Sequence, residues 1–360
     1  MINSLVLKNF RSFKSKKIDF EKNLVIIHGD NAKGKSTILE AIYLILNGSA
    51  PWGGTYKNFL NFDNEKEKYF TITMKVDDET ELTLYQDNSS KSFLVDKKRV
   101  SKKKFFSFKK ANLFSPEQIE LLMYLSQKRR DFLDDLISKI DIDYAEKVVL
   151  YKKVLRQRNS YLKKLSKTFF QTGEINQNDT QILYWTESLV KLAAAIMIKR
   201  CEIIDKLKSK TFFVEYRPSL TLNFFENMID EEELKKIYLK QMEENIKKDI
   251  VTGFTNLGIH RDDWAIFSKK QDLKKFGSRG EKRLAIARLI LQTQEIYKEY
   301  LGYYPVLLLD DIAAELDTPN TERIFNEKIL LKQQAFIATV DTRQVPKEIV
   351  KKGQKVKLGV

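Results

Sequence analysis

Short segments in the first hundred residues alternate between apolar and polar positions, which is the pattern of strands with one buried face. Segments 69–76 and 81–85 alternate with a period of two, and the acidic pair between them predicts the turn of a β-hairpin. A continuous apolar run over 24–27 predicts a strand that is buried on both faces. The runs 306–309 and 335–338 have the same character, so we expect α/β structure at both ends of the chain.

The spacing of apolar residues becomes helical after Pro116, with repeats of three and four residues. Thr180 is the expected N-cap of one of these helices. Helices are expected over about 117–139, 142–168, 180–209, 231–247 and 280–300. The predicted organisation is therefore a discontinuous α/β domain, residues 1–115 plus 251–360, with an inserted helical arm domain over residues 116–250.

Composition limits the classes of function that the chain can have. With 360 residues, 42% of them hydrophobic, the chain is long enough for real cores. A net charge of +15 favours a polyanionic partner, nucleic acid first and an acidic membrane surface second. One cysteine and two histidines exclude an intrachain disulfide and argue against a cysteine- or histidine-based metal centre. The sequence has no run of 18 apolar residues, so we expect a cytoplasmic protein without a membrane span.

The most specific motif follows the strand 24–27 directly. Residues 29–37 fit the phosphate-binding pattern G-x-x-x-x-G-K-[ST] and lead into a helix over about 36–46. Backbone N–H groups of such a loop surround a phosphate, and the helix N-terminus adds positive potential. Lys35 is expected on the β- and γ-phosphates and the Ser36 hydroxyl on Mg²⁺. The predicted nucleotide-binding residues of this loop are Gly29, Asp30, Asn31, Ala32, Lys33, Gly34, Lys35, Ser36 and Thr37.

Two acids end the buried strand 306–309, at the position where ligands bind in open α/β sheets. Asp310 is the expected Mg²⁺ ligand, directly or through water. Asp311 is the expected catalytic acid that orients the attacking water or accepts its proton, together with Lys35 on the phosphates.

Residues 310–317 resemble the Walker B and D-loop run of the SMC/ABC-type ATPases, which ends at Asp317 here. Residues 277–283, with Ser278 and Gly280, resemble the signature of that family, which binds the γ-phosphate of ATP held on a second subunit. An ordinary loop before a capped helix is the alternative for this segment.

These motifs, in this order, resemble the RecF family of the SMC/Rad50 branch. The resemblance also rests on the segments 5–13, 39–44, 113–117, 129–134, 151–159 and 258–263. Ala32 stands where the family usually has Gly, which requires a negative φ at that residue. Ile259 replaces Pro, and the expected switch histidine after the last strand is absent from the sequence.

The resemblance implies an ABC/SMC-head-like P-loop ATPase with slow hydrolysis of ATP in the presence of Mg²⁺. It implies an ATP-dependent homodimer that binds double- and single-stranded DNA at gaps and junctions in recombinational repair and replication-fork maintenance. RecR, RecO and RecA are the implied partners, and Arg11 is an implied phosphate contact.

Two alternatives stay open. The chain could be another SMC-branch ATPase that acts as an ATP-switched DNA clamp or defence protein with negligible turnover. The basic tract 97–110 could track DNA phosphates, or it could be a solvated segment whose phenylalanines belong to the core.

Overall fold

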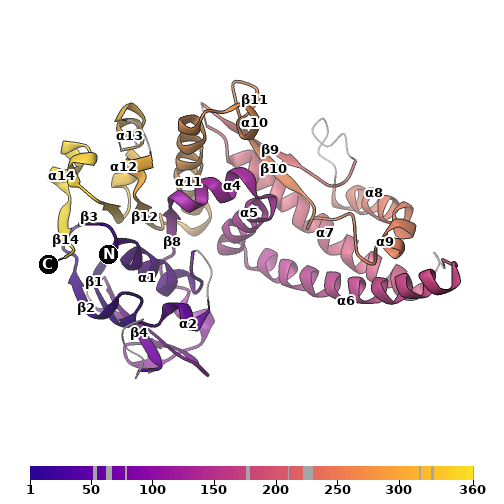
Figure 1. The fold of residues 1–360 in the computed structure, drawn as a ribbon, viewed down its shortest axis with the longest axis horizontal. Coiled ribbons are helices and arrows are strands. Elements are labelled where there is room, and N and C mark those ends of the chain that lie inside the picture. The colour runs from indigo at the N-terminus through magenta and orange to yellow at the C-terminus, as the bar shows by residue number, and fades with distance from the viewer. Residues whose placement is uncertain are drawn as a thin grey trace. The chain divides into compact units, whose positions relative to one another are not determined.

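The computed structural model describes residues 1–51, 55–61, 67–77, 79–175, 179–209, 211–221, 230–315, 318–325 and 328–359. The chain divides into two compact units, which Figure 1 shows in ribbon form. The first unit comprises Met1–Ile119 and Arg279–Val360, and the second comprises Glu120–Ser278.

The second boundary differs from the predicted one at residue 250. Strand β10 (Asp263–Ser268) pairs antiparallel with β9 (Phe213–Arg217), so the segment that contains it belongs with the helical unit. Strand β9 is short and lies within a helical stretch of sequence, where apolar spacing gives little warning of a strand pair.

A parallel sheet forms one layer of the first unit, in the order β14-β3-β13-β12-β8. Its strands are β14 (Gln354–Lys357), β3 (Leu24–His28), β13 (Ala335–Thr339), β12 (Val306–Asp310) and β8 (Ala111–Phe114). The three predicted apolar runs are strands β3, β12 and β13, and β12 and β13 are buried throughout. Segments from both ends of the sequence therefore lie side by side in one sheet, as predicted.

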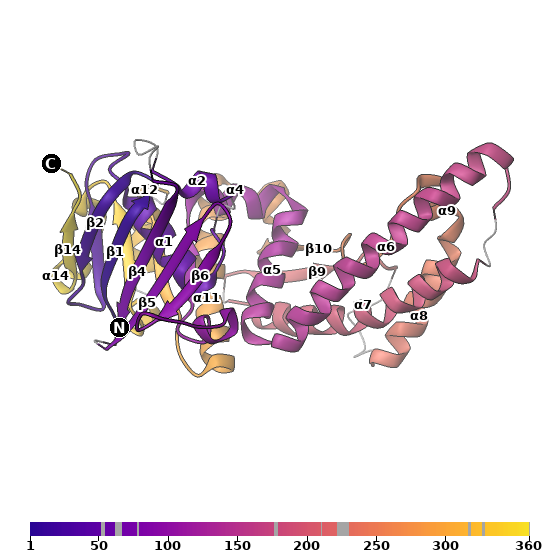
Figure 2. The same cartoon turned by 90° about the horizontal axis from the view of Figure 1, so that it is seen from below.

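An antiparallel sheet forms the other layer, which Figure 2 shows face-on beside helix α1. Its strands, in spatial order, are β2 (Phe13–Asp19), β1 (Ile2–Phe10), β4 (Tyr69–Val76), β5 (Thr80–Asp87), β6 (Lys91–Val95) and β7 (Lys98–Arg99). Strands β4 and β5 form the predicted hairpin, with Val76 opposite Thr80. Apolar residues from the inner face of this sheet pack into one core with α1 (Lys35–Asn47) and the parallel sheet.

The basic tract contributes both to the core and to the surface. Helix α3 (Lys102–Phe105) exposes its three lysines, whereas Phe105 is buried in the core and Phe106 and Phe108 pack against it. The phenylalanines are therefore structural. The other helices of the first unit are α2 (Tyr56–Phe59), α11 (Arg279–Leu301), α12 (Ile312–Glu315), α13 (Thr318–Phe325) and α14 (Lys347–Lys352), with the 3-10 turns Lys328–Leu331 and Thr342–Gln344.

The second unit is mainly helical, as predicted. It contains α5 (Ser126–Ile140), α6 (Ile142–Thr172), α7 (Thr180–Lys206), α8 (Glu231–Glu244), α9 (Ile246–Thr252), α10 (Leu273–Phe276) and the short strand β11 (Gln271–Asp272), while α4 (Pro116–Tyr124) spans the boundary. The predicted N-cap Thr180 is wrong by one residue, because the Asp179 carboxylate accepts the N–H groups of Gln181 and Ile182. Asp is the better acceptor at this position.

Helices α6 and α7 pack along each other, and a buried ion pair joins α6 to α9. Arg158 donates to Asp249 at 2.7 Å, and both side chains are almost fully buried. By length and hydropathy α7 is the one helix of the described ranges that could cross a membrane, and 44% of its most apolar window is buried within this unit.

Candidate nucleotide-binding site

The phosphate loop connects β3 to α1, in the strand–loop–helix context that the sequence predicts. Two glycines are required by geometry. A Cβ at Gly29 (φ 150°) would lie 2.3 Å from the Leu358 carbonyl oxygen, and one at Gly34 (φ 90°) would lie 2.4 Å from the Phe13 ring. Ala32 has φ 62°, so the expected negative φ at this position is wrong and the loop holds an alanine in a left-handed conformation.

Lys35 is buried and folds back over its own loop. Its Nζ donates to the carbonyl oxygens of Gly29 at 2.7 Å and Asp30 at 3.0 Å. The loop and α1 line a cleft of about 880 Å³, including its open mouth. Of the predicted site residues, the cleft brings together Arg11, Asn31, Ala32, Gly34, Lys35, Ser36, Thr37 and Asp311.

Asp310 and Asp311 lie at the carboxyl end of β12, as the sequence predicts. Burial, together with the neighbouring Asp311, raises the pKa of Asp310 to about 6, against an opposing hydrogen bond from the Ser36 hydroxyl. Burial also raises the pKa of Asp311. Each carboxylate keeps one buried oxygen without a hydrogen-bond partner, so both have unused capacity to accept a ligand.

The group formed by Ser36 and Asp310 fits Mg²⁺. A hydroxyl and a carboxylate are hard oxygen donors, and Mg²⁺ needs only one or two such protein ligands when phosphate oxygens complete its shell. Within the described ranges no group of three or more His, Cys, Asp or Glu residues could hold a metal, so a site made of protein ligands alone is not formed there.

Glu40 and Phe59 are site residues that the sequence prediction missed. The Arg11 guanidinium donates to both carboxylate oxygens of Glu40, at 2.9 and 2.7 Å, and lies 5.0 Å from the centre of the Phe59 ring. Glu40 is a buried acid in helix α1, and the residues beside it on that helix are apolar. A charged residue within an apolar segment is the signal that the sequence offers for this position.

The predicted signature lies at the start of α11. Ser278 is exposed, and a side chain added at Gly280 would meet open space. Gly280 is not among the residues that line the cleft of the phosphate loop. The predicted contact Asp317 lies outside the described residues.

Comparison with known proteins gives the class first. Residues 4–302 match the AAA domain family. A solved SMC head bound to the C-terminal winged-helix domain of ScpA shares the fold, with a TM-score of 0.50 and 16% identity over 94% of this chain and 89% of that one. The family match and the site thus define a P-loop ATPase, and its fold is that of an SMC head.

Closer similarities give the family. The chain is 32% identical to the DNA replication and repair protein RecF of Clostridium kluyveri, over 98% of this chain and 96% of the relative. It is 30% identical to RecF of Geobacillus sp., over 97% and 95%. The solved structure of the recombination mediator protein RecF with ATP has a TM-score of 0.81 and 26% identity over 100% of this chain and 98% of that one. The chain belongs to the RecF family of DNA replication and repair ATPases.

Proposed function

We propose that this protein binds ATP and Mg²⁺, hydrolyses ATP slowly, and uses ATP to form a homodimer on DNA. The observation that carries the proposal is the convergence of Lys35, Ser36, Asp310 and Asp311 at the carboxyl end of one parallel sheet. A phosphate-binding lysine, oxygen ligands for a metal ion and a general base meet there. Phosphoryl transfer to water requires this set of groups.

Each of these residues has a separate role. Lys35 would exchange the loop carbonyls for the β- and γ-phosphates. Ser36 and Asp310 would hold Mg²⁺, which would neutralise charge on the phosphates. Asp311 orients the attacking water and accepts its proton. Its raised pKa brings the carboxylate closer to the operating pH than an ordinary aspartate, which favours proton transfer. Asp has a shorter reach than Glu, so we expect turnover to be slow.

The second half of each site is supplied by another copy of the chain. Ser278 is exposed and an added side chain at Gly280 would meet open space, so a partner's nucleotide can approach this helix start. Asp317 belongs to the same proposed interface by the resemblance of its motif. Arg11, clamped beside the phosphate loop, is proposed to contact the nucleotide phosphates.

DNA is the proposed polyanion, in single- or double-stranded form. The chain carries a net charge of +15, and the exposed lysines of α3 add a basic surface segment. By family, RecR, RecO and RecA are the proposed partners, and the cytoplasm is the proposed location. The alternative, a clamp with negligible turnover, would use the same site without measurable release of phosphate.

The test combines ATP binding, phosphate release and light scattering on gapped DNA and without it. The parent chain should bind ATP with Mg²⁺, double its mass and release phosphate slowly. Lys35→Ala should lose ATP binding and dimerisation while its circular dichroism spectrum stays unchanged. A Lys35→Ala chain that still binds and hydrolyses ATP would show that the site is wrongly assigned.

A further inference from the structure

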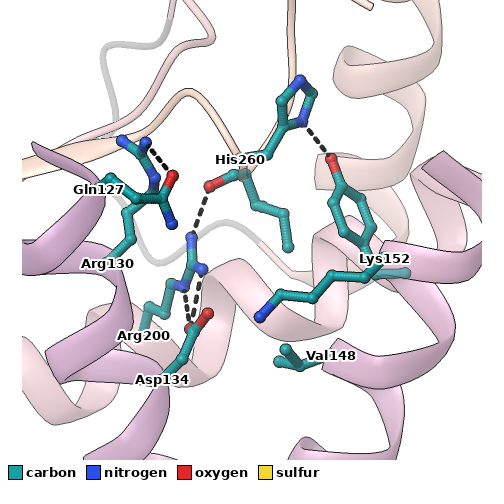
Figure 3. A pocket seen from close by; sticks show the side chains of 9 residues that line it. Gln127, Arg130, Asp134, Val148, Lys152, Arg200 and His260 are labelled. Atoms are coloured by element: carbon teal, nitrogen blue, oxygen red, sulfur yellow. Dashed lines mark hydrogen bonds and ion pairs between the residues drawn. The ribbon is translucent and has the colours of Figure 1, made fainter. Parts of the chain in front are cut away.

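The second unit contains a half-open cavity of about 330 Å³, including its mouth, that is formed entirely by residues 120–278. Figure 3 shows that its side chains come from α5, α6 and α7 and from the segment before β10. Val148 and Ile259 supply apolar wall. Its charged lining residues are Arg130, Asp134, Lys152 and Arg200.

Arg200 forms an ion pair with Asp134, the acid that lines this cavity. Arg200 is almost fully buried and contacts Asp134 at 2.8 Å and Asp262 at 3.7 Å. It also donates to the Ile259 carbonyl oxygen at 2.8 Å. The negative charge of Asp134 is thus already matched, and Arg200 has no charge left over for a ligand.

Arg130 is different, because no carboxylate pairs with it among the described residues. Its guanidinium donates to the Asp262 backbone carbonyl at 2.7 Å and to the Gln127 side chain at 2.8 Å. Its Nε is buried and has no hydrogen-bond partner. The charges of Asp263, Asp262 and Asp131 act on Arg130 without an ion-pair contact. Asp263 is bound by Nε and one terminal nitrogen of Arg129, at 2.6 and 2.7 Å, and Asp262 lies 3.7 Å from Arg200.

Lys152 adds a second cation to the same cavity, and within the described ranges it too makes no ion pair. Figure 3 shows its side chain extending toward the ion pair of Arg200 and Asp134. The His260 ring contributes no charge. Its Nδ1 accepts from the Tyr151 hydroxyl at 2.8 Å, its Nε2 faces the Thr255 carbonyl oxygen at 3.2 Å, and burial lowers its pKa to about 4.

We propose that this cavity binds a phosphate group on Arg130 and Lys152. Partial burial of a guanidinium without a carboxylate partner costs free energy, and an anion bound in the cavity offsets that cost. The planar fork of Arg with an adjacent Lys point charge matches phosphate oxygens. Val148 and Ile259 leave an apolar side for the organic part of the ligand. The phosphate is carried either by a small phosphorylated molecule or by a DNA strand.

The test measures binding of inorganic phosphate by calorimetry to the full-length chain. All variants carry Lys35→Ala, so that the phosphate loop does not contribute. Lys152→Gln should weaken phosphate binding about ten-fold, the loss of one charge-assisted hydrogen bond, and Arg130→Gln should weaken it further. Lys153→Gln is the matched control, because Lys153 is an exposed neighbour on α6 that does not line the cavity.

Equal phosphate binding by Lys152→Gln and Lys153→Gln would overturn the proposal, as would no phosphate binding at all. If Arg130→Gln does not fold, Lys152→Gln decides, since its side chain is exposed. Competition then identifies the source within the proposal. Displacement of phosphate by a single-stranded oligonucleotide assigns the cavity to DNA, and displacement by thymidine monophosphate alone assigns it to small phosphorylated molecules.

Discussion

Arg11 and Glu40 form a two-pronged ion pair at 2.7 and 2.9 Å, which fixes the arginine beside the phosphate loop. Arg11 has φ 53°, and its backbone N–H donates to the Phe59 carbonyl oxygen at 2.8 Å. A left-handed residue held by contacts on its backbone and side chain is a pre-organised group. The geometry makes Glu40 a positioning residue for Arg11.

Glu40→Gln should therefore lower ATP affinity about ten-fold with little change in the fold, because Gln fills the same space without the charge. The measurement is a double-mutant cycle with Arg11→Ala, read as ATP dissociation constants. The two effects should be strongly non-additive, since Glu40 acts through Arg11. Additive effects would show that Glu40 serves only the packing of α1.

Asp310→Asn should stabilise the nucleotide-free protein at pH 7. The folded-state pKa of Asp310 is raised to about 6, so the folded form prefers the protonated acid, and stability falls as the pH rises from about 4 to about 6. The variant removes this penalty, so its free energy of unfolding should exceed that of the parent by roughly 2 kcal/mol at pH 7.

The gain should disappear at about pH 3, below the ordinary carboxyl pKa, where Asp310 is protonated in both the folded and the unfolded chain. Mg²⁺-dependent ATP binding by the variant should be weakened. Urea unfolding at the two pH values measures the difference. A variant that is less stable than the parent at pH 7 would contradict the buried, partly unsatisfied state of this carboxyl group.

Asp311→Asn should keep ATP affinity and block hydrolysis, because it removes the proton acceptor and leaves Asp310 in place. An ATP-bound dimer should then accumulate. Light scattering with ATP and Mg²⁺ should give twice the monomer mass, and phosphate release should fall at least about 100-fold. Monomer alone under these conditions would count against the proposed two-chain site.

Ser278→Arg should abolish ATP-driven dimerisation and turnover while each chain still binds nucleotide. A large cation at this helix start fills the space that the partner's γ-phosphate needs. Mixing Ser278→Arg chains with Lys35→Ala chains should restore activity only in part. In a heterodimer one of the two shared sites is then intact and the other carries both defects. If Ser278→Arg alone keeps full activity, residues 277–283 are only a helix cap.

Ala32→Gly should stabilise the protein by roughly 0.5–1 kcal/mol, because Gly adopts a positive φ without the steric penalty of Cβ. Ala195→Gly, near the middle of α7, is the control with the opposite expected effect and should destabilise the protein by about 1 kcal/mol. Thermal unfolding of the two variants gives the comparison. A destabilised Ala32→Gly chain would show that the methyl group makes a favourable contact in the loop.

The sequence by itself determined the features that depend on neighbours along the chain. The phosphate loop, the two acids after a buried strand and the alternating hairpin β4–β5 were all predicted from spacing, and the structure has them. These motifs are readable because a loop, a helix start and a strand end are each set by local residue type. The order of the motifs was also enough to predict the RecF family, which the comparisons confirm.

Tertiary structure decided what depends on residues far apart in sequence. Three features depend on contacts that the periodicity of the sequence does not indicate. They are the pair of Arg11 and Glu40, the assignment of β10 to the helical unit, and the cavity of Arg130 and Lys152. The positive φ of Ala32 was likewise set by the loop around it and not by the residue. Burial and charge pairing are properties of three-dimensional packing, so they appear only when the elements are brought together.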